Sequence, residues 1–130
     1  MKTRNKEIID AYLSFLDKHI EDVISGDAME FLELNQIAGK LFISHSHLSD
    51  TIQKATGHHP CYFYDQKIID KAIELLTETD IPVAEVAMKL TYDPSNFSKF
   101  FKKWMNVTPG EYRRNYLQYS AKNKKPKSSP

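Results

Sequence analysis

The sequence predicts an all-α fold of seven helices, and three observations support that prediction. Apolar residues recur at steps of three and four along most of the chain, which is the spacing of one helix face. No stretch alternates apolar and polar residues in the manner of a half-buried strand. The 130 residues are 41% hydrophobic and 27% charged, which is the balance of one folded domain and argues against a disordered chain.

The first four helices follow from the apolar periodicity and from the residues that interrupt it. An amphipathic helix is predicted over about 6–25, and a Ser-Gly-Asp segment ends it. Two short helices are predicted within about 34–57, and Gly57 ends the second of them. A longer helix is expected to follow Pro60, over about 61–78.

The last three helices have clearer start signals. A short helix is expected over about 83–90 from its apolar spacing. The next is expected over about 94–105, because Asp93 suits the N-cap position and Pro94 suits the first turn. The segment TPGE at 108–111 has the form of a capping box with proline at the first helical position, and it predicts a short closing helix.

The folded domain is expected to cover residues 8–118. Residues 1–7 are expected to form an N-terminal arm. Residues 119–130 are expected to form a disordered basic tail, because the final segment KNKKPKSSP offers no apolar side chain to bury.

Three features favour a cytoplasmic protein. Cys61 is the single cysteine and cannot form an internal disulfide, which fits a reducing compartment. The opening segment MKTRNKEIID carries charges where a secretion signal requires an apolar run. No segment approaches the roughly 18 consecutive apolar residues of a membrane-spanning helix.

The formal net charge of +1 conceals a strong asymmetry along the chain. Residues 1–94 contain 9 Lys and Arg against 16 Asp and Glu, a balance of −7. Residues 95–130 contain 9 Lys and Arg against a single acidic residue, Glu111, a balance of +8, and the two balances sum to +1. This division favours a polyanionic partner, such as a nucleic acid, at the C-terminal end.

The sequence also matches itself at an offset of 49 residues, without a gap, so that 34–63 lies over 83–112. The identical pairs are Ala38 and Ala87, Lys40 and Lys89, Leu41 and Leu90, Ser46 and Ser95, Ser49 and Ser98, Lys54 and Lys103, and Pro60 and Pro109. Each copy has a short helix, a tight turn, a second helix and a proline-led exit. The repeat therefore predicts two helix-turn-helix units, at about 34–57 and 83–105, joined by the helix at about 61–78.

The second helix of such a unit can enter the major groove of DNA, where its outward side chains meet bases and phosphates. Burial of the apolar residues places positions 46, 49, 50 and 53 on one outward stripe, and 95, 98, 99 and 102 on the other. Lys99 suits a guanine edge or a phosphate. The predicted DNA-binding residues are His45, Ser46, Ser49, Asp50, Gln53, Lys54, Ser95, Asn96, Ser98, Lys99, Lys102 and Lys103. We expect the two helices to meet successive major grooves, about 34 Å apart, so that a monomer reads an asymmetric site.

Residues 8–114 resemble the AraC/XylS family of transcriptional regulators. The resemblance rests on the segments AGKLFISHSHLSDTIQKATGHHP and YDPSNFSKFFKKWMNVTPGEYR. It implies a bacterial seven-helix DNA-binding domain with two helix-turn-helix units, which activates or represses transcription. Because the chain has no room for a separate sensor domain, it is similar to the stand-alone type of this family (MarA/SoxS-like).

Carried over by position, the groove-facing residues implied by the resemblance are Ser46, Ser49 and Asp50 in the first unit and Ser95, Ser98 and Lys99 in the second. The chain departs from the family pattern at Thr91, where glycine is usual, and at Ile68, where a basic residue is usual. Asp50 stands where a basic or polar residue is common, and Gln53 stands where lysine is usual. The first unit is therefore expected to contact DNA weakly or to select a cytosine through Asp50.

Several alternatives stay open from the sequence. Asp50 can instead pair with Lys54, one helical turn further on. The histidines at 45, 47, 58 and 59 fit packing or capping better than a metal site, since they lack a recognised ligand spacing. The acidic face of the first helix is either a solvated surface or a partner surface, for example for RNA polymerase.

The main alternative function is a helical protein-protein interaction module whose DNA binding is weak or lost, suggested by the acidic first 94 residues. No enzyme is expected, because the sequence contains no phosphate-binding glycine loop, no metal-ligand motif and no nucleophile at recognisable spacing from a base. No cofactor and no membrane association are expected either. The favoured prediction is a sequence-specific regulator of transcription that binds double-stranded DNA.

Overall fold

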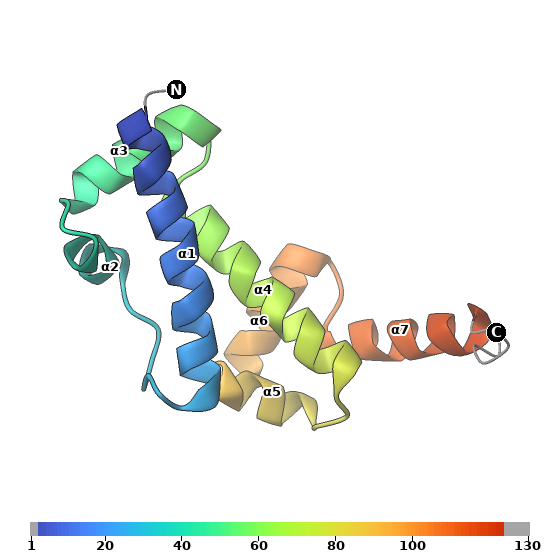
Figure 1. Cartoon of the computed structure of the whole chain (residues 1–130). Coiled ribbons are helices and arrows are strands. Elements are labelled where there is room, and N and C mark those ends of the chain that lie inside the picture. Colours follow the sequence, from blue (N-terminus) through green and yellow to red (C-terminus); the bar gives the residue numbers. More distant parts are fainter. Residues whose placement is uncertain (1–2, 124–130) are drawn as a thin grey trace, which may run out of the picture. The chain divides into compact units, whose positions relative to one another are not determined.

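A computed structural model describes residues 3–123, and every regular element within that range is a helix (Figure 1). In chain order the helices are α1 (Thr3–Ser25), α2 (Leu34–Lys40), α3 (His45–Thr56), α4 (Pro60–Glu78), α5 (Val83–Lys89), α6 (Pro94–Met105) and α7 (Pro109–Asn123). These seven helices, with no strand among the described residues, confirm the predicted all-α fold class.

The structure corrects the predicted ends of the domain. α1 begins at Thr3, so residues 3–7 of the predicted arm are helical. α7 is longer than the short closing helix that was expected and includes 119–123, which had been assigned to the disordered tail. The rest of that predicted tail, 124–130, lies outside the described residues.

Ion pairs lie along the first turns of α1. Arg4 and Glu7 form an ion pair of 3.9 Å, and Lys6 and Asp10 form one of 2.8 Å. Oppositely charged side chains three or four residues apart stabilise a helix without any buried apolar contact. The apolar periodicity, which begins only at Ile8, therefore underestimates the length of this helix.

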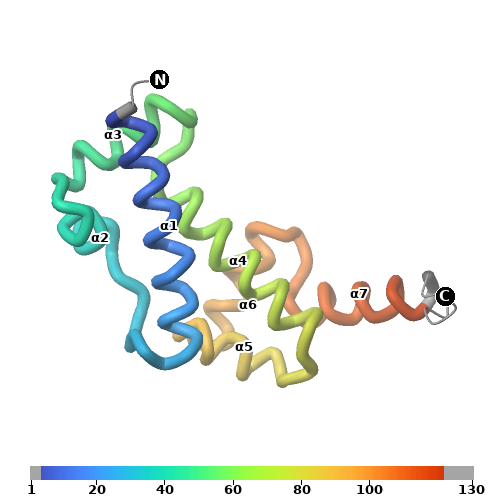
Figure 2. The backbone as a smooth tube through the Cα atoms, viewed as in Figure 1, coloured from blue at the N-terminus to red at the C-terminus, as the bar shows by residue number. Residues whose placement is uncertain are grey.

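The chain divides into two compact units, and the division falls between Ile68 and Ile69, inside α4. α4 itself is one continuous helix, drawn in green to yellow-green in Figure 2. The first unit holds α2 and α3, and the second holds α5 and α6, so each unit contains one copy of the sequence repeat.

The first unit encloses its own apolar core. Its fully or nearly buried side chains are Ile8, Tyr12, Leu16, Ile20 and Val23 from α1, Ile37 and Ala38 from α2, Leu48 and Ile52 from α3, and Tyr64 and Ile68 from α4. The hydroxyl of Tyr12 donates a hydrogen bond of 2.9 Å to the backbone oxygen of Pro60, which satisfies a polar group that has no access to water. This bond ties α1 to the first turn of α4.

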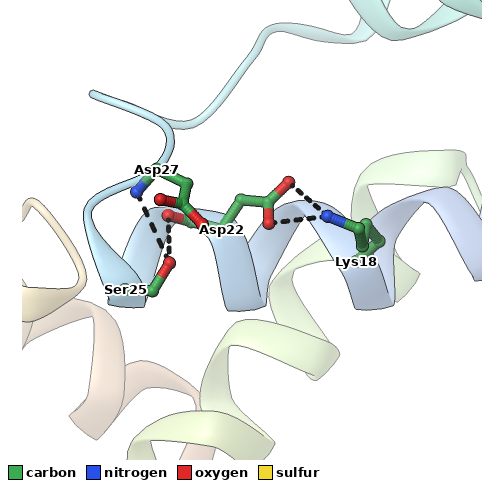
Figure 3. A network of polar contacts seen from close by, with 4 residues as sticks. All are labelled: Lys18, Asp22, Ser25 and Asp27. Atoms are coloured by element: carbon green, nitrogen blue, oxygen red, sulfur yellow. Dashed lines mark hydrogen bonds and ion pairs between the residues drawn. The ribbon is translucent and has the colours of Figure 1, made fainter.

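The C-terminal end of α1 is closed by short-range polar contacts (Figure 3). Lys18 Nζ contacts both carboxylate oxygens of Asp22, at 2.8 and 3.1 Å. The Ser25 hydroxyl donates to the backbone oxygen of Asp22 at 3.2 Å and accepts from the backbone N–H of Asp27 at 3.4 Å. The two bonds of Ser25 satisfy backbone groups at this end of the helix.

Two side chains hold the segment between α1 and α2 through hydrogen bonds to the backbone of Leu32. Nε2 of the buried His19 accepts the backbone N–H of Leu32 at 3.0 Å, and the Tyr64 hydroxyl donates to the backbone oxygen of Leu32 at 2.8 Å. The ring of His19 also contacts Phe15 and Phe31, with centroids 5.7 and 5.9 Å apart. The entry into α2 therefore depends on side chains from α1 and α4.

The second unit has a separate core, richer in aromatic rings. Its buried apolar side chains are Ile69, Ala72 and Leu76 from α4, Val86 and Ala87 from α5, Leu90 in the turn, and Phe97 and Phe101 from α6. Phe101 also meets Tyr112 of α7 edge-on, with centroids 5.6 Å apart. Trp104 of α6 is only half-buried.

The two units repeat the same backbone details 49 residues apart. The turn residues Phe42 and Thr91 both have a φ of 60°, in the left-handed region that favours glycine. The second helices also end alike, at Gly57 with a φ of 83° and at Asn106 with a φ of 67°. Thr91, where the family resemblance leads us to expect glycine, therefore has a left-handed backbone conformation.

Candidate nucleic-acid interface

The outward stripe of α3 is set by the buried residues behind it. Leu48, Thr51 and Ile52 are buried and form the inward side of the helix. Of the predicted DNA-binding residues on this helix, Ser49 is half-buried, and the exposed ones are His45, Ser46, Asp50, Gln53 and Lys54. The structure therefore places this set on the surface of the first unit.

The same geometry recurs on α6, with larger side chains behind it. Phe97 and Phe101 are buried, and the ring of Phe100 stacks on Tyr92 with centroids 5.3 Å apart. Ser98 is half-buried, and the exposed predicted residues are Ser95, Asn96, Lys99, Lys102 and Lys103. The aromatic residues thus fix this helix in the unit, and the basic residues interleaved with them face outward.

α6 starts at a charged cap. Oδ2 of Asp93 accepts the backbone N–H groups of Ser95 at 3.1 Å and Asn96 at 3.3 Å, and it also accepts the hydroxyl proton of Ser95 at 2.7 Å. These hydrogen bonds, with a smaller contribution from the positive charge of Lys99, hold the pKa of Asp93 below its usual value. Asp93 is therefore a carboxylate at neutral pH, and the predicted N-cap is confirmed.

α3 starts at a neutral cap in the equivalent position. The Ser44 hydroxyl accepts the backbone N–H of His47 at 3.0 Å. Its contact with the Ser46 hydroxyl is long, at 3.5 Å, and either oxygen can be the donor. α3 and α6 thus begin with the same backbone arrangement and different side-chain chemistry.

The lysines of α6 are not neutralised by the protein. Within residues 3–123 the structure records no ion pair for Lys99, Lys102 or Lys103, whereas Lys6 and Lys18 of α1 are each paired with an aspartate. Unpaired surface ammonium groups are the ones available to neutralise phosphates.

The alternative pairing considered for Asp50 is not present in the structure. Neither Asp50 nor Lys54 takes part in an ion pair or hydrogen bond among the described residues. Both side chains are exposed on the outward stripe of α3. Selection of a cytosine through Asp50 stays a prediction.

The two adjacent arginines of α7 differ in their surroundings, which the sequence did not indicate. Arg113 donates from Nε to the backbone oxygen of Leu76 at 2.9 Å and from its terminal nitrogen to that of Thr79 at 3.4 Å, so it caps the end of α4. Arg114 is exposed and, with Lys102, contributes to the lowered pKa of Glu111, after the hydrogen bonds from Thr108. Arg114 therefore adds a cation to the surface formed by the end of α6 and the start of α7.

The capping box predicted at the start of α7 is confirmed. The backbone N–H of Thr108 donates to Oε1 of Glu111 at 2.8 Å, and the backbone N–H of Glu111 donates to the Thr108 hydroxyl at 3.1 Å. The equivalent start of α4 uses a histidine, because Nδ1 of His59 accepts the backbone N–H of Cys61 at 3.1 Å.

The histidines lie at separate places on the first unit. His45 and His47 are exposed at the start of α3, whereas His58 stacks on Tyr62 with centroids 4.0 Å apart. Among residues 3–123, no three His, Cys, Asp or Glu side chains gather as metal ligands do. The described helices also include none with the length and apolar character that crossing a membrane requires.

A family model described as a helix-turn-helix domain matches residues 37–115 of this chain. The uncharacterized HTH-type transcriptional regulator YtdP of Bacillus subtilis is 32% identical over 106 residues, which cover 81% of this chain and 14% of that protein. The chain spans well under half the length of the first curated relatives that it matches. The stand-alone arrangement expected from the sequence therefore stays a prediction.

Solved structures share the arrangement of helices. The C-terminal domain of AraT, a response regulator from Geobacillus stearothermophilus, has a TM-score of 0.72 and 31% identity, and the match covers 83% of this chain and 84% of that one. A transcriptional regulator from Chromobacterium violaceum, described by its AraC-type DNA-binding domain, has a TM-score of 0.74. Its 19% identity, over 90% of this chain and 98% of that one, is evidence for the fold alone.

Proposed function

Because the chain belongs to the AraC-type family of helix-turn-helix domains, we propose that it binds double-stranded DNA at specific sequences and regulates transcription. The observation that carries the proposal is the duplicated unit, in which α3 and α6 each turn a polar stripe outward from a buried apolar face. A helix presented in this way fits the width of the major groove.

The two helices are proposed to play unequal parts. α6 anchors the chain, because Lys102 and Lys103 are unpaired and suited to phosphates, and Lys99 is suited to a guanine edge or a phosphate. α3 offers Ser46, Asp50 and other polar groups with one cation, Lys54, so it contributes less affinity. We propose that a single chain places α3 and α6 in successive major grooves of an asymmetric site.

The finer parts of this function are also proposals. The acidic exposed face of α1, which includes Asp10, Asp17 and Glu21, is a candidate surface for RNA polymerase or another regulator. A cytoplasmic location follows from action on bacterial DNA. We propose no catalytic role, because relatives such as YtdP are described as transcriptional regulators.

The proposal is tested by fluorescence anisotropy with mixed-sequence duplex DNA over a series of salt concentrations. The wild-type chain is expected to bind with micromolar or tighter affinity and a steep dependence on salt. Lys99→Glu/Lys102→Glu is expected to abolish binding, because it places two negative charges against phosphates. The matched control is Lys6→Glu/Lys18→Glu, which changes the net charge equally on α1, and it should retain most of the binding.

The alternative function, a protein-interaction module, makes the opposite prediction. Its support is the acidic balance of residues 1–94, which repels DNA. If the wild-type chain binds no duplex even at low salt, the DNA-binding proposal is wrong and the acidic face of α1 becomes the leading surface. If both double variants lose binding equally, net charge alone governs the contact and α6 has no special part in it.

A further inference from the structure

The Ser95 hydroxyl donates its only proton to a hydrogen bond within the protein. It donates to Oδ2 of Asp93 at 2.7 Å, and this oxygen also accepts the backbone N–H groups of Ser95 and Asn96. A hydrogen bond to a carboxylate is roughly twice as strong as one between neutral groups. Turning the hydroxyl away from Asp93 to donate elsewhere would therefore exchange a strong bond for a weaker one.

This bond limits what Ser95 can recognise. A serine hydroxyl has one proton to donate and two lone pairs that accept. With the proton directed at Asp93, the exposed oxygen of Ser95 retains only its acceptor capacity. Lys99 lies one helical turn further along the same stripe and has the opposite hydrogen-bonding capacity, because an ammonium group can only donate.

The bases differ in the groups they present in the major groove. Adenine presents the N6 amino group and cytosine the N4 amino group, whereas guanine and thymine present O6 and O4, which only accept. An acceptor-only hydroxyl can pair with the amino groups and not with these oxygens. The residue that accepts the hydroxyl proton of Ser95, here Asp93, therefore affects which base Ser95 favours.

We propose that Asp93 is a specificity-determining positioning residue, which holds Ser95 as an acceptor so that α6 prefers adenine or cytosine over guanine or thymine on the strand it contacts. This inference rests on the proposed DNA binding and adds to it the class of base read at one position. Asp93 acts through Ser95 and needs no contact of its own with DNA.

The first unit of the same chain provides the contrasting arrangement. Ser44 stands in place of Asp93, and Ser46 in place of Ser95, but their hydroxyl oxygens are 3.5 Å apart and either can be the donor. Ser46 is therefore free to donate to a guanine or thymine oxygen or to accept from an amino group. The restriction belongs to the second unit alone.

The test begins with duplexes selected from a randomised pool by the wild-type chain. Affinities are then measured for every single base-pair change in the selected duplex, with wild type and with Ser95→Ala. The position at which Ser95→Ala removes the preference is the one that Ser95 reads. At that position we expect wild type to favour adenine or cytosine by about fivefold, the ratio that one net hydrogen bond typically contributes.

Asp93→Ser then converts the cap of α6 into the cap of α3. Serine is itself a good N-cap, so the helix should persist, which circular dichroism and retained salt-dependent binding would verify. The preference at the Ser95 position should fall from about fivefold to below about twofold, because the hydroxyl can now also donate. In a Ser95→Ala background, Asp93→Ser should cause no further change at this position, since the effect passes through Ser95.

The reciprocal variant, Ser44→Asp, tests the same rule in the first unit and does not depend on the folding of the Asp93 variant. It should create or sharpen a preference for adenine or cytosine at the position read by Ser46. The inference is overturned if wild type favours guanine or thymine where Ser95 reads, if Ser95→Ala affects no position, or if Asp93→Ser leaves the preference intact. In each of these cases selective DNA binding itself survives, whereas a wild type that binds no duplex overturns the proposed function as well.

Discussion

The two helix-turn-helix units share their backbone and differ in the surface they present. Phe42 and Thr91 occupy the same left-handed turn position, and Gly57 and Asn106 end the second helices in the same way. Even the proline that starts the next helix is repeated and fully buried, as Pro60 and Pro109. The turn residue, the helix end and the buried proline that define the backbone of a unit are therefore all present twice.

The outward faces have diverged. Asp50 and Gln53 of α3 correspond to Lys99 and Lys102 of α6, so an acceptor and a neutral amide in one unit are replaced by two cations in the other. The cap changes from a neutral serine to a carboxylate at the same place. In this fold, therefore, one set of residues determines the backbone of each unit, and a different set determines the surface that the unit presents.

The largest effect is expected from breaking the shared core. Leu48 and Phe97 are equivalent and fully buried, so Leu48→Ala should cost about 2–5 kcal/mol and Phe97→Ala about 3–5 kcal/mol of unfolding free energy. Urea unfolding followed by circular dichroism measures both. The exposed Asn35→Ala provides a control that should change stability little. A cost below about 1 kcal/mol at either buried site would contradict an equivalent role for the two residues.

The second prediction makes the first unit resemble the second. Asp50→Lys should strengthen DNA binding roughly tenfold at ~0.1 M salt and steepen the log-log salt dependence by about 1, as one added phosphate contact does. Anisotropy over a salt series measures both values. Glu30→Lys, exposed on the same unit and equal in charge change, is the control and should have a smaller effect. Weaker binding by Asp50→Lys would mean instead that Asp50 contacts a base, as cytosine selection requires.

The third prediction concerns a contact found only in the first unit. Burial lowers the pKa of His19, whose neutral ring accepts the N–H of Leu32, while the charge of Asp22 acts weakly in the opposite direction. The unfolded chain therefore binds this proton more readily than the folded chain. The stability due to His19 is fully present above the ordinary histidine pKa of about 6.5 and is lost as the pH falls below it toward the lowered folded value.

His19→Gln isolates this effect, because its side-chain oxygen can accept the same N–H without titrating. The free energy of unfolding, measured from pH 7.5 to 5 in both proteins, should fall more steeply for wild type. The difference should approach about 1 kcal/mol, the typical net contribution of one hydrogen bond. Parallel profiles would show that protonation leaves the contact with Leu32 intact.

The smallest effects are expected at the shared turn. Thr91→Gly and Phe42→Gly should each stabilise the protein by about 0.5–1 kcal/mol, because relief of left-handed strain exceeds the greater entropy loss of glycine. Both side chains are exposed, Phe42 by 92%, so little packing is lost. Thermal unfolding would detect the shift, and Gly57→Ala, at a φ of 83°, should be destabilising by a similar amount. A loss of stability at either turn would indicate that the native side chain makes a favourable contact there.

The sequence predicted most of the fold because the main signals are local. The cap at Asp93 and the box of Thr108 with Glu111 depend on residues within three positions of each other, and both are confirmed. The repeat placed the turns correctly, since each unit has the same number of residues between its helices. The early start of α1 was missed because its first turn carries no apolar residue.

Contacts between distant residues could not be predicted in this way. Arg113 caps the end of α4 across 37 positions, and Tyr64 holds the backbone oxygen of Leu32 across 32. Neither pair has a spacing rule in the sequence. Helix periodicity predicted the exposure of most site residues, although Ser49 and Ser98 are half-buried. It could not predict the bond between Asp93 and Ser95, because an N-cap residue can leave a neighbouring hydroxyl free.

The matching ends of α3 and α6 have a consequence for how recognition can change. Each helix has twelve residues, preceded by a capping side chain and followed by a left-handed residue. Their junctions with the rest of the chain therefore impose the same geometric conditions. The outward residues of α3 and α6 can therefore be exchanged between the two units. The buried apolar positions must keep the side chains of the unit that receives the new residues. For the proposed DNA binding, this means that a new target can be reached by exchanging a short segment of the chain, with no redesign of the scaffold around it.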